Sequence, residues 1–522
     1  MRGITHTAAR SRRASAGVVV LALFVLALSA CDWTMFHSDS TQSGVGVDPG
    51  FTVAQAANLK VLWRYHPGWS IYSTPVTYQG RVYLGGGDGT LYSVDGTTGT
   101  VQWSRAYGTI PDHGCGSPAG FVSSPAVRAD ANGNPFVYVS TPQGTLQELD
   151  GTNGNVVWTA PVFTPGYFGT NGVSDYFPWS SPIVRNGIVY IGVSSNCDRP
   201  FVRGALMSFD AVTGAPIATL YTMPTGTDPN YASRDPKPPT TNWVGAGIWT
   251  SPAVDDHFVY VTTGSTYDDT DTAHPPTDTN QFDQYSVLKL DAKTLQVVGK
   301  FAVPQPQSVN DPDWGSTPTL FTATIGGQTV PMVGACNKDG HYYALRADTM
   351  RPVWSVSVGV GTPAGQQACL TSAIWDGAHL FVTSNQTTVG GRWTSSTTTS
   401  PQGYSWPTWT ASGGTTANAA VRMLDPATGI STATNAPLWE SAIQQLVLGS
   451  CSMNGQKTLI ACQTMDWSDT WNRTVVIDAS NGNHVNELQD GTGNWAGFSS
   501  PIWADGKLIV CDFDAMRAYV PA

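Results

Sequence analysis

The stretch STPVTYQGRVYLGGGDGTLYSVDGTTGTVQW, residues 73–103, carries the pattern that decides the fold. It opens on a Ser-Thr-Pro segment and ends on Asp95, Gly99 and Trp103, with the spacing D-x3-G-x3-W. Four runs of β-forming residues lie between turns that are rich in Gly and Asp, which is the pattern of short strands joined by tight turns. The stretch therefore predicts four short antiparallel strands that follow one another along the chain.

Related segments recur throughout the chain, and the second one repeats the ending with Asp150, Gly154 and Trp158. The openings of the repeats, in chain order, are Ser73-Thr74-Pro75, Ser123-Ser124-Pro125, Ser180-Ser181-Pro182, Thr250-Ser251-Pro252, Ser316-Thr317-Pro318, Thr371-Ser372-Ala373, Gly449-Ser450-Cys451 and Ser499-Ser500-Pro501. Repetition of one supersecondary unit is typical of architectures in which each unit buries its faces only against its neighbours.

Four-stranded repeats of this kind predict an all-β protein, an eight-bladed β-propeller of four-stranded antiparallel blades. The last repeat breaks off near Tyr519 without a fourth strand, and residues 59–64, LKVLWR, look like that missing strand. We therefore expect the ring to be closed by an N-terminal strand. Two stacked β-sandwiches are the alternative, but eight ordered openings and an incomplete last repeat disfavour them.

Composition agrees with this fold and excludes one class of partner. Of the 522 residues, 55 are Gly and 35 are Pro, which favours a turn-rich β protein over long helices. The formal net charge is −11. Because nucleic-acid binding needs a cationic surface, we expect no nucleic-acid partner.

The first thirty residues have the pattern of an export signal. Four arginines lie within the first thirteen residues, an apolar run follows over Val18–Leu28, and Leu28-Ser29-Ala30-Cys31 resembles a lipobox. We predict a lipoprotein signal peptide at residues 1–30, an N-terminal anchor and linker at 31–58 and the propeller at 59–522. Lipidation of Cys31 would place the protein outside the cytoplasm, anchored to the cell envelope, with no other membrane contact. A plain secretory signal followed by a chance cysteine is the alternative.

Seven cysteines remain after Cys31, and no pair has the spacing C-x2-C, which excludes zinc ribbons and c-type haem attachment. Cys197 and Cys336 end predicted second strands, whereas Cys115 and Cys369 precede predicted first strands. All four therefore belong to the same end of the propeller. Cys336–Cys369 and Cys115–Cys197 are candidate bridges between neighbouring blades, although spacing does not determine connectivity.

The D-x3-G-x3-W endings, together with Asp32-Trp33-Thr34-Met35-Phe36, resemble the pyrroloquinoline quinone (PQQ) repeat family over residues 32–522. That family includes PQQ-dependent alcohol and polyvinyl alcohol dehydrogenases, and also propeller lipoproteins that bind no cofactor. The resemblance therefore implies the fold and leaves the chemistry open.

Two segments resemble the part of the dehydrogenases that holds the quinone. Gly247-Ile248-Trp249 resembles the segment whose tryptophan stacks under PQQ. The turn Asn337-Lys338-Asp339-Gly340 resembles the one whose Arg or Lys bonds the quinone oxygens. The resemblance implies that Trp249, Lys338 and Asn337 bind PQQ.

The calcium ligands and the catalytic base of the family match less well. The expected glutamate is missing, and the neighbouring carboxylate is Asp198, while Ser265 stands where the family has an asparagine. The catalytic aspartate corresponds to Asp311 or Asp313, or its place is taken by Asn310. Because calcium takes six to eight oxygen ligands, these changes would weaken a calcium site without abolishing it. The adjacent cysteine pair that covers the quinone in alcohol dehydrogenases is absent from the sequence.

Long insertions fall in loops at the end of the propeller that carries the proposed PQQ-binding residues. Loops on a rigid scaffold often carry function. Those with aromatic or acidic side chains are residues 161–179, 223–248, 265–284 and 385–419. We expect these side chains to form a ligand-facing surface suited to a polymer, a sugar or an envelope protein.

Three functions remain open at this point. The first is an envelope-anchored binding protein that uses its loop-rich face and needs no cofactor. The second is a PQQ- and calcium-dependent dehydrogenase of an alcohol, polyvinyl alcohol or a sugar, with an external electron acceptor. The third is a structural assembly factor. Convergence of the Asp198 and Asp313 carboxylates over the Trp249 ring would favour the enzyme.

Overall fold

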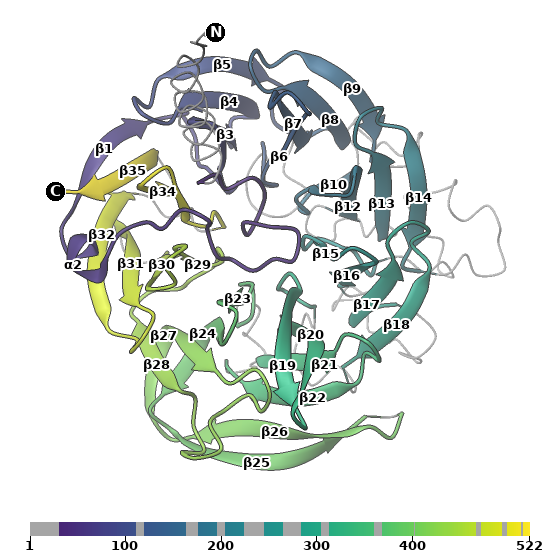
Figure 1. The fold of residues 1–522 in the computed structure, drawn as a ribbon, viewed down its shortest axis with the longest axis vertical. Coiled ribbons are helices and arrows are strands. Elements are labelled where there is room, and N and C mark those ends of the chain that lie inside the picture. The colour runs from purple at the N-terminus through teal and green to yellow at the C-terminus, as the bar shows by residue number, and fades with distance from the viewer. Residues whose placement is uncertain are drawn as a thin grey trace, which may run out of the picture.

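The computed structural model describes residues 31–110, 120–162, 176–195, 204–223, 245–264, 283–303, 313–359, 368–400, 402–465, 471–492, 498–512 and 515–522. Eight sheets, each built around four antiparallel strands, stand around a central axis, as Figure 1 shows, which confirms the predicted eight-bladed propeller. The helix α2 (Val53–Ala56) is a single turn. No helix in the described part of the chain has both the length and the apolar character needed to span a membrane.

The strands follow the repeats found in the sequence. Blades 1 to 4 contain, from the axis outward, β2 (Val76–Tyr78), β3 (Arg81–Gly85), β4 (Thr90–Asp95) and β5 (Val101–Ala106); β6 (Ala126–Ala129), β7 (Pro135–Ser140), β8 (Thr145–Asp150) and β9 (Val156–Pro161); β11 (Ile183–Arg185), β12 (Ile188–Ser195), β13 (Ala205–Asp210) and β14 (Pro216–Tyr221); and β15 (Ala253–Val254), β16 (Phe258–Thr262), β17 (Ser286–Asp291) and β18 (Val297–Ala302). The short β10 (Tyr176–Phe177) pairs with the end of β12.

Blades 5 to 8 continue the ring. They contain β19 (Thr319–Ile325), β20 (Gln328–Cys336), β21 (His341–Arg346) and β22 (Pro352–Ser357); β23 (Ile374–Trp375), β24 (Leu380–Val389), β27 (Thr415–Leu424) and β28 (Trp439–Ile443); β29 (Ser452–Met453), β30 (Leu459–Gln463), β31 (Trp471–Asp478) and β32 (His484–Thr492); and β33 (Ile502–Ala504), β34 (Lys507–Cys511), β35 (Met516–Pro521) and β1 (Leu59–Tyr65).

The last blade joins the two ends of the chain. β1 pairs antiparallel with β35, with Leu59 opposite Pro521 and Tyr65 opposite Met516. The predicted closure by an N-terminal strand is therefore confirmed.

The Ser-x-Pro openings recur because their two hydroxyl positions perform different tasks. The first hydroxyl ties the inner strand to the second strand of its own blade: Ser73 Oγ donates to the Gly85 carbonyl at 2.7 Å and accepts the Gly85 N–H at 3.0 Å. The second hydroxyl accepts a backbone N–H from the preceding blade. These N–H donors and hydroxyl acceptors are Thr74 and Ser124, Ser124 and Ser181, Ser181 and Ser251, Ser251 and Thr317, Ser372 and Ser450, and Ser500 and Thr74. We call this arrangement the hydroxyl ring.

The D-x3-G-x3-W endings join neighbouring blades at the outer rim. Trp103 on β5 donates its indole N–H to the Gly151 carbonyl in the next blade at 2.9 Å. A Cβ at Gly154 would lie 2.7 Å from the Trp103 ring, and the φ of Gly154 is +75°. Both the lack of space and the left-handed backbone therefore favour glycine in this turn. Each glycine turn thus receives the tryptophan of the preceding blade, and Trp63 on β1 does the same at Gly96 and Gly99 of blade 1.

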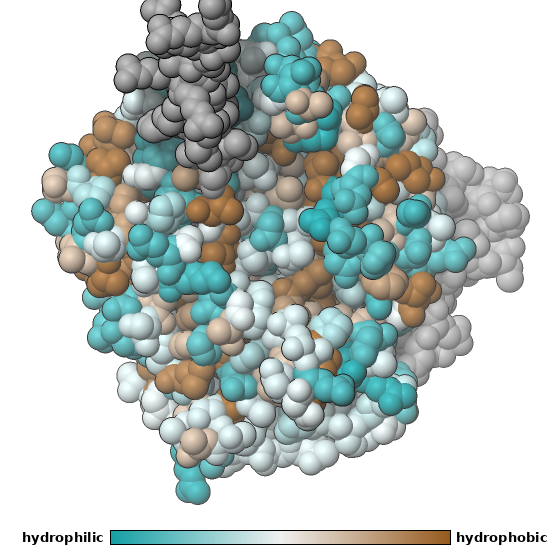
Figure 2. All heavy atoms as spheres, in the orientation of Figure 1, coloured by the Kyte–Doolittle hydropathy of each residue, from teal (hydrophilic) through white to brown (hydrophobic). Residues whose placement is uncertain are grey.

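Residues 33–48 lie along the inner strands at the end opposite the Ser-x-Pro openings, and Figure 1 shows this segment crossing the middle of the ring. We call it the floor segment. Its carbonyls accept backbone N–H groups from many blades, for example Thr77 to Trp33 at 2.7 Å and Trp375 to Ser43 at 2.8 Å. The surface in Figure 2 mixes hydrophilic and hydrophobic residues, with the hydrophobic ones scattered.

The carboxyl group of Asp32, just before the floor segment, makes stability depend on pH. Burial and then the charge of Asp505 raise the pKa of Asp32 to about 7, although Oδ1 accepts the Gln79 N–H at 2.9 Å. The unfolded pKa is about 3.9, so the native state holds the extra proton between about pH 4 and 7. Stability should therefore fall as pH rises through that window and stay level above it.

Asp32→Asn is expected to flatten this slope and to make the variant more stable than the wild type at pH 8. Urea unfolding midpoints measured from pH 4 to 8 test this expectation. A variant whose midpoints run parallel to those of the wild type would show that Asp32 does not titrate in this window.

The insertion in blade 6 corrects one expectation. Residues 385–419 form extensions of β24 and β27 with a hairpin between them, β25 (Arg392–Thr399) and β26 (Ser405–Ser412). β26 pairs parallel with β22, so the hairpin lies along the outer rim of blade 5, as Figure 1 shows. Trp393 and Trp406 are 5% and 2% exposed, and the Trp406 indole N–H donates to Ser355 Oγ at 3.1 Å. The expectation that these two aromatics face a ligand was wrong, because they pack the hairpin onto its neighbour.

Candidate functional site

Three side chains proposed from the sequence meet at the end of the propeller that carries the Ser-x-Pro openings. Trp249 precedes β15, Asp313 precedes β19, and Lys338 lies in the turn between β20 and β21. The Lys338 ammonium lies 5.2 Å from the centroid of the Trp249 ring and 3.9 Å from Asp313 Oδ2. Since the Lys338 and Asp313 side chains are only 10% and 8% exposed, this ion pair is shielded from water.

Backbone contacts explain why Lys338 and Asp313 lie side by side. The Lys338 N–H donates to the Asp313 carbonyl at 3.0 Å, and Trp314 forms an isolated β-bridge with Asn337. Asn337 Oδ1 accepts the Asp339 N–H at 2.9 Å, so this side chain, proposed as a PQQ ligand, shapes the turn.

A glycine makes room for the carboxylate. A Cβ at Gly264 would lie 3.0 Å from Asp313 Oδ2 and 3.1 Å from Oδ1. These distances are shorter than ordinary van der Waals contact, so any larger residue would displace Asp313. Gly264 thus places its backbone close to the carboxylate, and the Lys338 ammonium approaches the same group.

Asp339 supports the turn, and sequence reasoning did not single it out. Its carboxylate accepts the Tyr343 hydroxyl at 2.6 Å and the His341 N–H at 2.8 Å, and it lies 3.4 Å from His341 Nδ1. Burial alone would lower the pKa of His341, but the charge and hydrogen bonds of Asp339 outweigh burial and raise it. The signal that could have found Asp339 is its place two residues after Asn337, since Asn and Asp often bond backbone N–H groups two residues ahead.

A cavity of about 90 Å³ lies on the axis beside this site. The hydroxyl ring lines it together with Trp249, and Phe36 of the floor segment also contributes. Tyr72, Trp179 and Phe498, from three different blades, form an aromatic cluster at the cavity, with ring centroids 6.3 Å (Tyr72–Phe498) and 6.4 Å (Trp179–Phe498) apart. Among the described residues the lining includes no charged side chain.

The remaining predicted site residues have different outcomes. Asp198, Ser265, Asp311, Cys115 and Cys197 lie outside the described residues. Within the described part of the chain, no group of three His, Cys, Asp or Glu side chains gathers in a way that could hold a metal.

Two disulfides are present among the described residues. Cys336 and Cys369 form a bridge between blades 5 and 6, which was one of the two candidate pairs. The second, Cys451–Cys462, was not anticipated and lies within blade 7. Cys511 is buried and carries a free thiol.

Residues 33–371 match the family model described as "PQQ: Glucose/ethanol/alcohol dehydrogenase, beta-propeller domain". The chain belongs to this family. The matched residues of this PQQ-family propeller include Trp249, Asp313 and Lys338.

Curated relatives of the PQQ-family propeller include quinone-dependent enzymes. It is 24% identical over 400 residues to "Polyvinylalcohol dehydrogenase" from Pseudomonas sp, covering 69% of this chain and 56% of the relative. It is 26% identical over 322 residues to "Alcohol dehydrogenase (quinone), dehydrogenase subunit" from Gluconacetobacter polyoxogenes, covering 57% and 41%. The chain thus spans about half the length of the curated relatives it matches.

Solved structures support the fold. Quinohemoprotein alcohol dehydrogenase from Comamonas testosteroni superposes with a TM-score of 0.68 at 17% identity, covering 95% of this chain and 81% of that one. BamB from Moraxella catarrhalis superposes with a TM-score of 0.50 at 12% identity, covering 88% and 99%. Both of the sequence relatives reported above are named as dehydrogenases.

Proposed function

We propose that this protein is a PQQ-dependent dehydrogenase that oxidises an alcohol. The observation that carries the proposal is the placement of the Lys338 ammonium over Trp249 and beside Asp313. A cation, an aromatic face and a carboxylate that meet away from water are the groups needed to hold an anionic planar quinone and to accept a proton.

The side chains present fit PQQ, a flat quinone that carries carboxylates. Trp249 offers a ring face, and its buried indole N–H makes no hydrogen bond within the described structure. Lys338 would bond the quinone oxygens, and the hydroxyl ring offers neutral donors nearby. When bound, PQQ would supply the carbonyl that accepts two electrons from the alcohol.

Asp313 is the residue that would take the hydroxyl proton of the alcohol. A general base must lie within reach of that proton and be ionised, and the neighbouring Lys338 ammonium favours the ionised carboxylate. The aromatic cluster of Tyr72, Trp179 and Phe498 would contact the hydrocarbon part of the alcohol. Polyvinyl alcohol, named for a relative, therefore belongs among the first substrates to test.

The proposal also includes a calcium site and a position at the cell envelope. Asp198 and Ser265 would contribute oxygen ligands to calcium, which stays a prediction. Lipidation of Cys31 would anchor the protein to the cell envelope. Because the Cys31 carbonyl accepts the Asp505 N–H in blade 8 at 3.4 Å, on the side of the floor segment, the site would then face away from the membrane.

Titration of the purified protein with PQQ and calcium, followed by tryptophan fluorescence, tests the proposal. We expect saturable quenching that Trp249→Ala abolishes and Trp69→Ala, a change at a 52% exposed tryptophan, leaves intact. A dye-linked assay with short alcohols, sugars and polyvinyl alcohol would follow. No binding at micromolar PQQ with excess calcium would overturn the enzyme and return attention to a polymer, sugar or protein ligand.

A further inference from the structure

We propose that the Cys336–Cys369 disulfide is a positioning cross-link that sets the Lys338 ammonium over Trp249. This inference rests on the proposed function where it concerns affinity for the quinone. Its geometric part concerns this chain alone. The two cysteines are therefore positioning residues and not catalytic ones.

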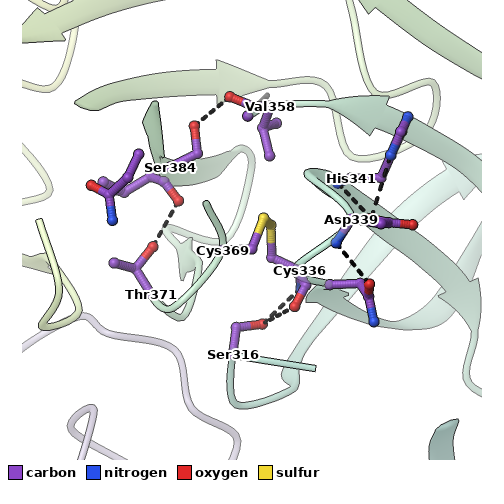
Figure 3. The surroundings of a disulfide bond; sticks show 12 residues. Ser316, Cys336, Asp339, His341, Val358, Cys369, Thr371 and Ser384 are labelled. Carbon is purple, nitrogen blue, oxygen red and sulfur yellow. Dashed lines mark hydrogen bonds and ion pairs between the residues drawn. A yellow bond between two sulfur atoms is a disulfide. The ribbon is translucent and has the colours of Figure 1, made fainter. Parts of the chain in front are cut away.

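The place of the cross-link in the chain suggests this role. Cys336 is the last residue of β20 and lies two residues before Lys338, whereas Cys369 lies in the loop that leads into blade 6. Both residues are fully buried, and the bond joins segments 33 residues apart in sequence. Figure 3 shows the bond between the two blades.

On the blade 5 side, both cysteines contact the segment that carries Asp313. Ser316 Oγ accepts the Cys336 N–H at 2.7 Å and donates to the Cys336 carbonyl at 3.3 Å, as Figure 3 shows. A Cβ at Gly315 would lie 2.1 Å from the Cys369 carbonyl oxygen, so the backbones of Gly315 and Cys369 lie directly against each other. Both cysteines thus contact the short segment that begins at Asp313.

On the blade 6 side, a hydrogen bond connects the segment after Cys369 to strand β24. Thr371 Oγ1 donates to the Thr383 carbonyl in β24 at 2.7 Å, and Ser384 Oγ donates to the Val358 carbonyl just after β22. Figure 3 shows these bonds on the far side of the disulfide from Asp339 and His341. The segment just after Cys369 is therefore bonded to β24, and β24 in turn is bonded to the end of β22.

Lysine needs such support more than most residues. Its ammonium sits on a flexible four-carbon stem, so its position depends on how firmly its backbone is held. Within blade 5 that backbone is held by the Lys338 N–H bond to Asp313 and by the bridge between Asn337 and Trp314. The disulfide adds the connection to blade 6. Without it, the turn could move relative to Trp249 in blade 4.

The test compares two disulfides of the same protein. Cys336→Ser/Cys369→Ser removes the cross-link, and Cys451→Ser/Cys462→Ser removes the one in blade 7 as a matched control. The first readout is the indole N–H signal of Trp249 in a ¹H–¹⁵N spectrum, assigned with Trp249→Phe. The second is the Kd for PQQ from fluorescence quenching.

We expect the first double variant to shift the Trp249 signal and to raise the Kd about 10-fold or more, because small misplacements of a binding group have large effects. The control should leave both unchanged. An unshifted Trp249 signal with a wild-type Kd would overturn the inference, as would equal effects of both double variants.

Two further arms keep the test decisive. If the serine variant does not fold, Cys336→Val/Cys369→Ala fills the site with apolar atoms and is read in the same way. If the wild type does not bind PQQ, the proposed function fails, while the Trp249 signal still decides whether the cross-link positions Lys338.

Discussion

Lys338→Met is expected to lower kcat/KM of the proposed dehydrogenase by about 10²–10³-fold, the usual effect of removing one preorganised electrostatic group. Methionine is unbranched like lysine and one atom shorter, and it carries no charge. The change would remove the cation over Trp249 and leave the shielded Asp313 carboxylate without its ion-pair partner. Steady-state kinetics with a dye acceptor measures the effect.

Two comparisons make this prediction specific. Lys338→Arg keeps the charge and should retain more activity than Lys338→Met. Lys289→Met is the matched control, because Lys289 is also a buried lysine over an aromatic ring, 3.7 Å from the centroid of Phe258, but lies in the body of blade 4 and donates to the Ala347 carbonyl. Equal losses in Lys338→Met and Lys289→Met would point to stability and contradict a role for Lys338 at the site.

Arg422→Met is expected to lower the free energy of unfolding by about 3–5 kcal/mol, the range for removing one partner of a buried ion pair. Arg422 is 1% exposed and pairs with Glu440 at 2.8 Å. Its guanidinium also donates to the carbonyls of Val358 and Thr388 and to the hydroxyls of Ser384 and Thr387. The change would remove these bonds and leave the largely buried Glu440 carboxylate without its cationic partner.

Arg346→Met is the control for this change. Arg346 also pairs with a carboxylate, that of Asp348 at 2.6 Å, but both side chains are more than a third exposed. Such surface pairs contribute roughly 0–1 kcal/mol. Chemical unfolding of both variants gives the comparison, and similar midpoints for the two would contradict the importance of burial for Arg422.

The sequence was informative where a contact repeats. Ser-x-Pro and D-x3-G-x3-W recur because each makes a bond within or between blades, so repetition along the chain makes a weak signal strong. The closing strand could be predicted because the last repeat is incomplete, and β1 supplies what it lacks.

Contacts that occur once were harder to predict. The floor segment binds through its backbone carbonyls, and such bonds do not require particular side chains. The sequence of residues 31–58 was therefore interpreted only as an anchor and linker. Residues 392–412 resemble a Ser/Thr-rich loop, yet they form a hairpin because β22 offers an edge for β26. Trp249 and Lys338 came from resemblance, and only the structure shows that they meet.

The pairing of β1 with β35 also fixes the order in which the molecule can be completed. β1 spans Leu59–Tyr65, whereas its partner strand β35 spans Met516–Pro521 and is therefore made much later. Bringing together segments so far apart in sequence requires the closure of a very long loop, and contacts of this kind form late. During synthesis the edge of β1 therefore stays unpaired until β35 has been made, and a product truncated before Met516 lacks the partner of β1.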